Sequence, residues 1–292
     1  MNIEAQARCW QQRPRQASTP PSSQPELLSV EKPPQSKTLT PPHSPSIPAL
    51  SSGVEIVIAH FNEDLEWLGP FVSSCHVYSK GEPVELADEH SECGSSAIEQ
   101  ASPYKSLQQL PNIGRETHTY LTYITTHYDD LPPYMLLLQG DIHSINHGTP
   151  AHTDLTLSEI ISSTTQLAPG GVLPIGAVME FSDWQGLVYK QGWVERRGKT
   201  LVRSKLTPGE YWKTMFSADS SEQSETKGHP KSVRFVQGAC FGVTKDAILH
   251  RPRSFWLNVL RYFEELQECN PEEGHYMERL WYSLLDPSVI ER

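Results

Sequence analysis

A continuous apolar run, 134–138, ends at three residues that could bind a ligand: Gln139, Asp141 and His143. A short apolar run without alternation is typical of a strand buried on both faces, and such strands occur mainly in parallel sheets covered by helices. Ligands of open α/β sheets bind outside the carboxyl ends of the strands. We therefore expect Gln139 and Asp141 to bind substrate at that edge of the sheet.

A second apolar run, 54–59, ends in a similar way, at His60 and Asn62. If the two strands are parallel neighbours, both polar clusters lie at one edge of the sheet, and we expect His60 and Asn62 to bind substrate there as well. An alternative stays open for this cluster, because Asn62 or Asp64 could instead cap a helix that begins near residue 65.

A predicted helix, 112–127, carries three further candidate binding residues in its first turns: Arg115, Glu116 and His118. Residues three apart on a helix share a face, so Arg115 and His118 lie together. The first turn is the positive end of the helix dipole, where a carboxylate, phosphate or acyl group can be held. An ordinary surface pair of Arg115 and Glu116 would give the same pattern.

Two adjacent carboxylates, Asp129 and Asp130, follow this helix just before the buried strand. Such a pair could assist the deprotonation of an amine or bind a cation, whether a metal ion or a guanidinium group. A solvated turn before Pro132 would explain the two residues equally well.

Strands and helices alternate along the chain, which predicts an α/β fold. We expect residues 53–292 to form a single α/β catalytic domain, a three-layer sandwich with a mostly parallel sheet of the Rossmann-like or GT-A-like kind. The expected strands lie at 54–59, 75–79, 134–139 and 233–237, and the expected helices near 64–74 and at 112–127, 153–167, 254–266 and 272–285. Thr153 or Asp154 is the expected cap of the third helix.

The first 52 residues are expected to form a disordered tail. Residues 13–52 are rich in Pro, Ser, Thr and Gln and lack apolar periodicity, so they bury too little surface to offset their ordering entropy. The start of the chain does not resemble a signal peptide, and no later stretch reaches membrane-spanning length. We therefore expect a cytoplasmic protein with no membrane contact. Five cysteines without CxxC spacing fit reduced thiols better than a disulfide framework or a zinc site.

The net charge of −11 argues against a general nucleic-acid binder. One segment, 190–205, departs from this balance because its basic residues far outnumber its acids. Its centre holds Arg196, Arg197 and Lys199. The segment is either the solvated face of a hairpin or a patch that contacts phosphate groups.

Four motifs follow one another along the chain: Gly114-Arg115-Glu116-x-His118-x-Tyr120-Leu121, Tyr128-Asp129-Asp130-Leu131-Pro132, Leu138-Gln139-Gly140-Asp141 and Glu278-Arg279-Leu280-Trp281. Together they resemble a long-uncharacterised fungal family that includes the arginine-containing cyclodipeptide synthases, and the resemblance covers 54–285. The resemblance implies a cytosolic enzyme that takes aminoacyl groups from charged tRNAs, one of them arginyl-tRNA. It would join them into a cyclic dipeptide for secondary metabolism, without a cofactor, a metal ion or a protein partner.

The same resemblance implies roles for individual residues. Asp129 and Asp130 would be catalytic, binding the arginyl guanidinium or assisting deprotonation of an α-amine, while Arg115 and His118 would orient the acyl group. Contacts with tRNA phosphate would come from the basic segment, at Arg196, Arg197 and Lys199. The acidic signature of those synthases is Asp-Asp-x-x-Glu, and here Pro133 stands at the position of the Glu.

An alternative resemblance is to metal-dependent GT-A glycosyltransferases that use a nucleotide sugar. The segment 57–63 is similar to their first strand and turn, and Asp141-Ile142-His143 is similar to their metal-binding motif. Asp141 and His143 would then hold Mn²⁺ or Mg²⁺, which neutralises a diphosphate leaving group. A binding protein without catalytic activity is a third alternative.

Overall fold

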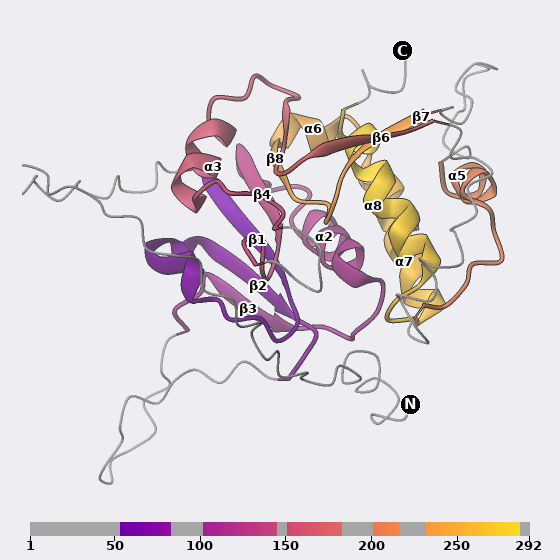
Figure 1. The fold of residues 1–292 in the computed structure, drawn as a ribbon, viewed down its shortest axis with the longest axis horizontal. Coiled ribbons are helices and arrows are strands. Elements are labelled where there is room, and N and C mark those ends of the chain that lie inside the picture. The colour runs from indigo at the N-terminus through magenta and orange to yellow at the C-terminus, as the bar shows by residue number, and fades with distance from the viewer. Residues whose placement is uncertain (1–52, 83–101, 145–150, 183–200, 217–231, 287–292) are drawn as a thin grey trace, which may run out of the picture.

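A six-stranded sheet forms the centre of the protein in the computed structural model, which describes residues 53–82, 102–144, 151–182, 201–216 and 232–286 (Figure 1). The strand order is β3-β2-β1-β4-β8-β5. Strands β3, β2, β1 and β4 are parallel, whereas β8 runs antiparallel to both β4 and β5. The strands are β1 (Val54–His60), β2 (Cys75–Ser79), β3 (Ser106–Gln109), β4 (Tyr134–Gln139), β5 (Val172–Pro174) and β8 (Phe241–Thr244). The predicted α/β class with a mostly parallel sheet is confirmed.

Strands β1 and β4 are the parallel neighbours that the sequence predicted. Ala59 is paired with Gln139, so both strands end at the same edge. The apolar residues of β4 are buried on both faces because they alternate between two core clusters: Met135 and Leu137 belong to one, and Leu136 and Leu138 to the other. This explains the continuous apolar run in the sequence.

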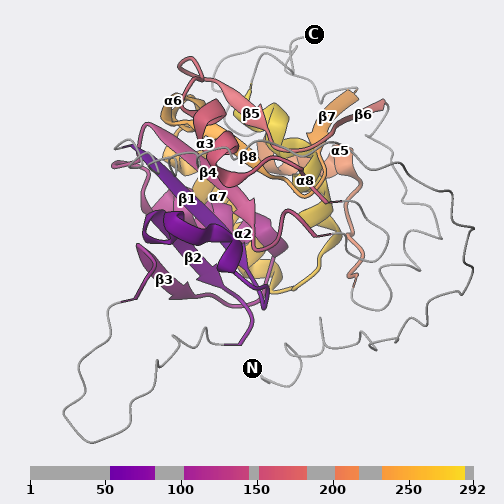
Figure 2. The same cartoon turned by 60° about the vertical axis from the view of Figure 1, so that its left-hand side comes forward.

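Helices lie against both faces of the sheet (Figure 1 and Figure 2). Residues of α2, α7 and α8 pack in the first cluster, whereas residues of α3 and the 3-10 helix η1 pack in the second. A separate antiparallel pair joins β6 (Val178–Ser182) to β7 (Ser232–Val236). The helices are η1 (Glu66–Ser74), α2 (Arg115–Thr126), α3 (Leu157–Thr164), α5 (Pro208–Phe216), α6 (Lys245–Leu249), α7 (Arg253–Leu266) and α8 (Glu272–Leu285).

The predicted helix over 153–167 is shorter in the structure because its cap is a later residue. Thr156 caps α3: its Oγ1 accepts a hydrogen bond from the N–H of Glu159 at 3.3 Å, and the Glu159 carboxylate accepts one from the N–H of Thr156 at 2.8 Å. This reciprocal pair is a capping box. The prediction of Thr153 or Asp154 as the cap was therefore wrong.

Two of the three cysteines in the described ranges match the sequence prediction. Cys75 and Cys240 are buried free thiols, but Cys269 is disulfide-bonded, so the prediction of reduced thiols is wrong at that residue. The expected tail, 1–52, and the centre of the basic segment, Arg196, Arg197 and Lys199, lie outside the described residues. Among the described helices, none combines the length and apolar character that a membrane crossing requires.

Candidate functional site

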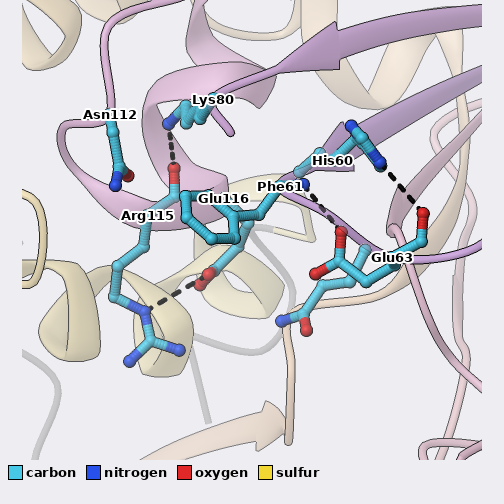
Figure 3. Close-up of a pocket in the computed structure, with 9 residues that line it drawn as sticks. His60, Phe61, Glu63, Lys80, Asn112, Arg115 and Glu116 are labelled. Atoms are coloured by element: carbon cyan, nitrogen blue, oxygen red, sulfur yellow. Dashed lines mark hydrogen bonds and ion pairs between the residues drawn. The ribbon is translucent and has the colours of Figure 1, made fainter. Parts of the chain in front are cut away.

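A pocket lies at the edge of the sheet where β1, β2 and β4 end and α2 begins (Figure 3). It encloses about 510 Å³ of space, part of it open solvent. The chain runs outward from β1 through β2 to β3 and then returns to β4 on the other side of β1. The pocket therefore lies at the reversal of strand order, the usual ligand site of open α/β sheets. Its lining residues are Ala59, His60, Phe61, Glu63, Lys80, Asn112, Arg115, Glu116 and Gln139.

The structure brings four predicted binding residues together in this pocket: His60, Arg115, Glu116 and Gln139. Gln139 is fixed by a hydrogen bond from its Nε2 to the carbonyl oxygen of Gly238, at 2.8 Å. The sequence placed the two strand ends at one edge of the sheet, and the structure adds the start of α2 to it. The chemistry of the site also depends on residues that the sequence analysis did not select, chiefly Glu63, Lys80 and Asn112.

The turn after β1 places the Glu63 carboxylate at the pocket. Its Oε2 accepts a hydrogen bond from the N–H of Phe61 at 2.7 Å, while the Glu63 carbonyl oxygen lies 3.0 Å from Nε2 of His60 (Figure 3). Gly140, just after β4, leaves room for this carboxylate. A Cβ at Gly140 would lie 2.5 Å from Oε2 of Glu63, too close for a normal contact. A side chain in place of this glycine would therefore force the Glu63 carboxylate to move.

The start of α2 has an unusual backbone that Lys80 stabilises. Gly114 and Arg115 have φ angles of 61° and 54°, and a positive φ is uncommon for a residue such as Arg. Lys80 donates hydrogen bonds from Nζ to the carbonyl oxygen of Ile113, at 2.7 Å, and to that of Arg115 (Figure 3). Burial lowers the pKa of Lys80 to about 7; the Glu116 carboxylate opposes this shift and Arg115 adds to it.

Two buried polar groups of the pocket have no hydrogen-bond partner within the described ranges. They are Oε1 of Glu116 and Nδ2 of Asn112, in residues that are 7% and 8% exposed. The other carboxylate oxygen of Glu116 lies 3.3 Å from Nε of Arg115. Leaving a buried polar group without a partner costs about 1–3 kcal/mol. A ligand that offers a donor to Glu116 and an acceptor to Asn112 would remove this cost.

Helix α8 contacts Arg115, one of the residues that line the pocket. Nη1 of Arg115 lies 2.9 Å from Nδ1 and 2.7 Å from Nε2 of His275. His275 lies 3.5 Å from a Glu278 oxygen, and the other Glu278 oxygen accepts a hydrogen bond from the N–H of Gly238 at 2.9 Å. Burial alone would raise the pKa of Glu278, but His275 and the charges of Arg279 and Arg115 hold that pKa well below its usual range. The Glu278-Arg279 motif therefore contacts His275, which in turn contacts the pocket residue Arg115.

His118 and Asn62, two other predicted binding residues, do not line the pocket. His118 is buried on α2, where burial and the nearby Lys80 charge lower its pKa to about 3. Asn62 is exposed, and its Oδ1 accepts a hydrogen bond from the N–H of Glu82 at 2.9 Å, which links the turns after β1 and β2. Oδ1 of Asp64 accepts a hydrogen bond from the N–H of Glu66 at 2.8 Å, but the N-cap of η1 is Leu65, so the capping alternative is wrong for both Asn62 and Asp64.

Asp141 and His143, the alternative metal ligands, are both used in the turn after β4. Oδ1 of Asp141 accepts hydrogen bonds from the N–H groups of His143, at 3.1 Å, and Ser144, at 3.0 Å. Nε2 of His143 lies 2.9 Å from the carbonyl oxygen of Leu155. Across the ranges that the structure describes, no group of three or more His, Cys, Asp or Glu side chains is arranged to hold a metal ion.

Asp129 and Asp130 lie at the opposite end of α2 from the pocket. The helix has 12 residues, which corresponds to about 18 Å along its axis. Both side chains are exposed: Asp129 is 3.2 Å from Nη1 of Arg253, and Asp130 is 3.8 Å from Nδ1 of His127. The structure does not bring the predicted catalytic pair together with the predicted binding residues.

Fold and pocket together define an α/β protein with a pocket lined by charged residues at the carboxyl edge of its sheet. The chain belongs to the family described as "Protein of unknown function (DUF3431)", whose family model matches residues 56–291. No curated protein and no solved structure matches the chain.

Proposed function

We propose that the chain is an aminoacyltransferase, a cytoplasmic arginine-containing cyclodipeptide synthase that supplies secondary metabolism. It takes arginine and a second amino acid from their charged tRNAs and joins them into a cyclic dipeptide, without a cofactor. The fold proposed for it is a three-layer sandwich of the Rossmann-like or GT-A-like kind. The two apolar clusters on opposite faces of the sheet support that architecture.

The observation that carries the proposal is the unpartnered carboxylate oxygen of Glu116 in the pocket. A guanidinium group is planar and presents several N–H donors in a fork that matches a carboxylate. Glu63 supplies a second carboxylate to the same pocket. In this proposal, Glu116 and Glu63 recognise the arginyl side chain, in place of Asp129 and Asp130 at the other end of α2.

The opposite chemistry is available for the acyl end of the substrate. Nδ2 of Asn112 is a buried donor without a partner in the described ranges, and Arg115 lies at the start of α2. Donors placed beside an ester carbonyl stabilise the negative charge that develops on its oxygen during attack by an amine. An aminoacyl ester is already activated, so the proposed reaction needs orientation and proton transfer but no ATP. The basic residues Arg196, Arg197 and Lys199 remain the predicted contacts with tRNA phosphate.

The test uses the purified full-length chain with arginyl-tRNA and a mixture of other charged tRNAs, with the products identified by mass spectrometry. We expect a cyclic dipeptide containing arginine, and none after RNase treatment. Glu116→Gln should lower the rate at least about tenfold, or roughly 1.4 kcal/mol in activation free energy. The matched control is Glu66→Gln, which alters an exposed carboxylate in η1 and should keep the rate.

Three results would contradict parts of the proposal. Product formation from free amino acids and ATP after RNase treatment would exclude the tRNA-dependent reaction. Binding of Mn²⁺ with a nucleotide diphosphate, lost in Asp141→Asn, would favour the glycosyltransferase alternative instead. A loss of rate in Asp129→Asn, with Glu116→Gln unaffected, would locate the chemistry at the other end of α2.

A further inference from the structure

Lys80 combines burial, fixed geometry and a position in the pocket. The residue directly follows β2 and is 8% exposed. Its Nζ is anchored by the carbonyl oxygens of Ile113 and Arg115, and the side chain lines the pocket beside Glu116 (Figure 3). In the described ranges no carboxylate forms an ion pair with Lys80, although buried ammonium groups usually have such a partner.

These contacts leave one position on the Lys80 nitrogen for a ligand. An amine nitrogen is tetrahedral: one bond goes to Cε, and two N–H groups point to the carbonyl oxygens of Ile113 and Arg115. In the neutral form the fourth position is a lone pair, and in the charged form it is a third N–H. Either form keeps both backbone hydrogen bonds, so Lys80 can gain and lose a proton without disturbing the start of α2.

The charges around Lys80 allow both protonation states near neutral pH. Helix α2 contributes Arg115, Glu116 and His118, while the turn after β1 contributes His60 and Glu63 to the same pocket. Burial lowers the pKa of Lys80 more than the Glu116 charge raises it, so the pKa is about 7. A buried lysine of this kind is a suitable general base, because its neutral amine is populated at the pH where the enzyme works.

We propose that Lys80 accepts the proton of the substrate's α-ammonium group and later returns it to the leaving group. This inference rests on the proposed aminoacyl transfer. The lone pair of Nζ takes a proton from the α-ammonium, and the freed amine forms a bond to the carbonyl carbon of the other aminoacyl ester. The bond between that carbon and the ribose oxygen of the tRNA breaks, and this oxygen takes the proton from Lys80. The attacking nitrogen loses its second proton to water as the amide forms. Closure of the ring repeats the same exchange, so no oxidant, reductant or further reactant is needed.

The first experiment measures single-turnover formation of the dipeptide by the full-length chain as a function of pH. The wild-type rate should rise with pH through an apparent pKa near 7. Lys80→Arg keeps a positive charge and donors for the two carbonyls, but it cannot act as a base. We expect it to lower the rate at least about 100-fold and to lose the rise near pH 7, while its thermal midpoint and its arginyl-tRNA binding stay close to wild type.

The second experiment needs no variant and so does not depend on one that folds. Wild-type protein is labelled with a trace of an amine-acylating reagent at a series of pH values, and the modification of Lys80 is quantified by mass spectrometry. Labelling of Lys80 should titrate near pH 7. Labelling of Lys80 that rises only around pH 10.5, the ordinary pKa of a lysine, would overturn the inference.

The two proposals fail in different ways. If wild-type protein forms no dipeptide from charged tRNAs, the proposed function falls, and the role of Lys80 in it falls as well. If wild-type protein forms the dipeptide and Lys80→Arg keeps its rate and pH profile, only the role of Lys80 is overturned. Lys80 would then serve only to hold the start of α2.

Discussion

Glu55 in β1 offers a sharp test of the electrostatics of this fold, because three side chains donate hydrogen bonds to its carboxylate. They are His76, with Nε2 at 2.9 Å, Tyr123, with its hydroxyl at 2.6 Å, and Lys105. The Glu55 side chain is only 19% exposed. Burial alone would raise its pKa, but the hydrogen bonds outweigh that effect and lower the pKa to about 2.

The direction of the pH dependence follows from this lowered pKa. The ordinary pKa is 4.5 and the folded value about 2, so ionised Glu55 stabilises the fold above pH 4.5. That stabilisation is lost as the pH falls from 4.5 through 2. The difference in pKa corresponds to at most about 3 kcal/mol at pH 7, and about 1 kcal/mol of it should remain at pH 3. The side chain of Glu55→Gln cannot ionise. The unfolding free energy of this variant should therefore be lower than that of wild type, and the gap between the two should be smaller at pH 3 than at pH 7.

Denaturant unfolding followed by circular dichroism at pH 7 and pH 3 measures this gap. Glu265→Gln, at an exposed position of α7, is the control and should show a small gap at both pH values. A Glu55→Gln gap that stays constant between pH 7 and pH 3 would refute the reasoning, since the loss would then come from shape or packing and not from ionisation. A gap below about 0.5 kcal/mol at pH 7 would show that solvent screens the cluster as it does a surface ion pair.

Two further predictions concern the pocket turn and α3. Gly140→Ala should displace the Glu63 carboxylate from the N–H of Phe61, because the new Cβ would lie 2.5 Å from its oxygen. We expect the unfolding free energy to fall by about 0.5–1.5 kcal/mol, the net value of one hydrogen bond, and an arginyl ester to bind more weakly. Unchanged binding in a folded variant would contradict this role of the turn. Thr156→Ala removes the capping box of α3 and should lower the unfolding free energy by about 1 kcal/mol. The control, Ser163→Ala on the exposed face of the same helix, should leave the unfolding free energy unchanged. Equal thermal midpoints for the two variants would show that the capping box does not stabilise the protein.

The pocket residues that could be predicted from the sequence are those whose position depends on the direction of the strands. The apolar runs identified β1 and β4, and the rule that ligands bind at the carboxyl ends of parallel strands selected His60 and Gln139, both of which line the pocket. The same rule applied to β2 would have found Lys80, its next residue. Strand β3, Ser106–Gln109, was missed because three of its four residues are polar and none is fully buried.

The rest of the site depends on tertiary contacts that leave no local pattern. His275 contacts Arg115 although the two residues are 160 positions apart in the chain. Helical periodicity predicts which face of α8 carries His275, but it does not predict which other element that face contacts. Glu63 follows β1 as one polar residue among several, and only the structure shows that the N–H of Phe61 holds its carboxylate at the pocket.

The contact between Arg115 and His275 makes the pocket depend on α8, the last element that the structure describes. During synthesis, β1, β2, α2 and β4 all leave the ribosome well before Glu272–Leu285 does. A nascent chain at that stage lacks the partner that positions Arg115, although every strand that borders the pocket has been made. Under the proposed function, the incomplete chain would therefore be unable to act on the charged tRNAs that surround the ribosome translating it.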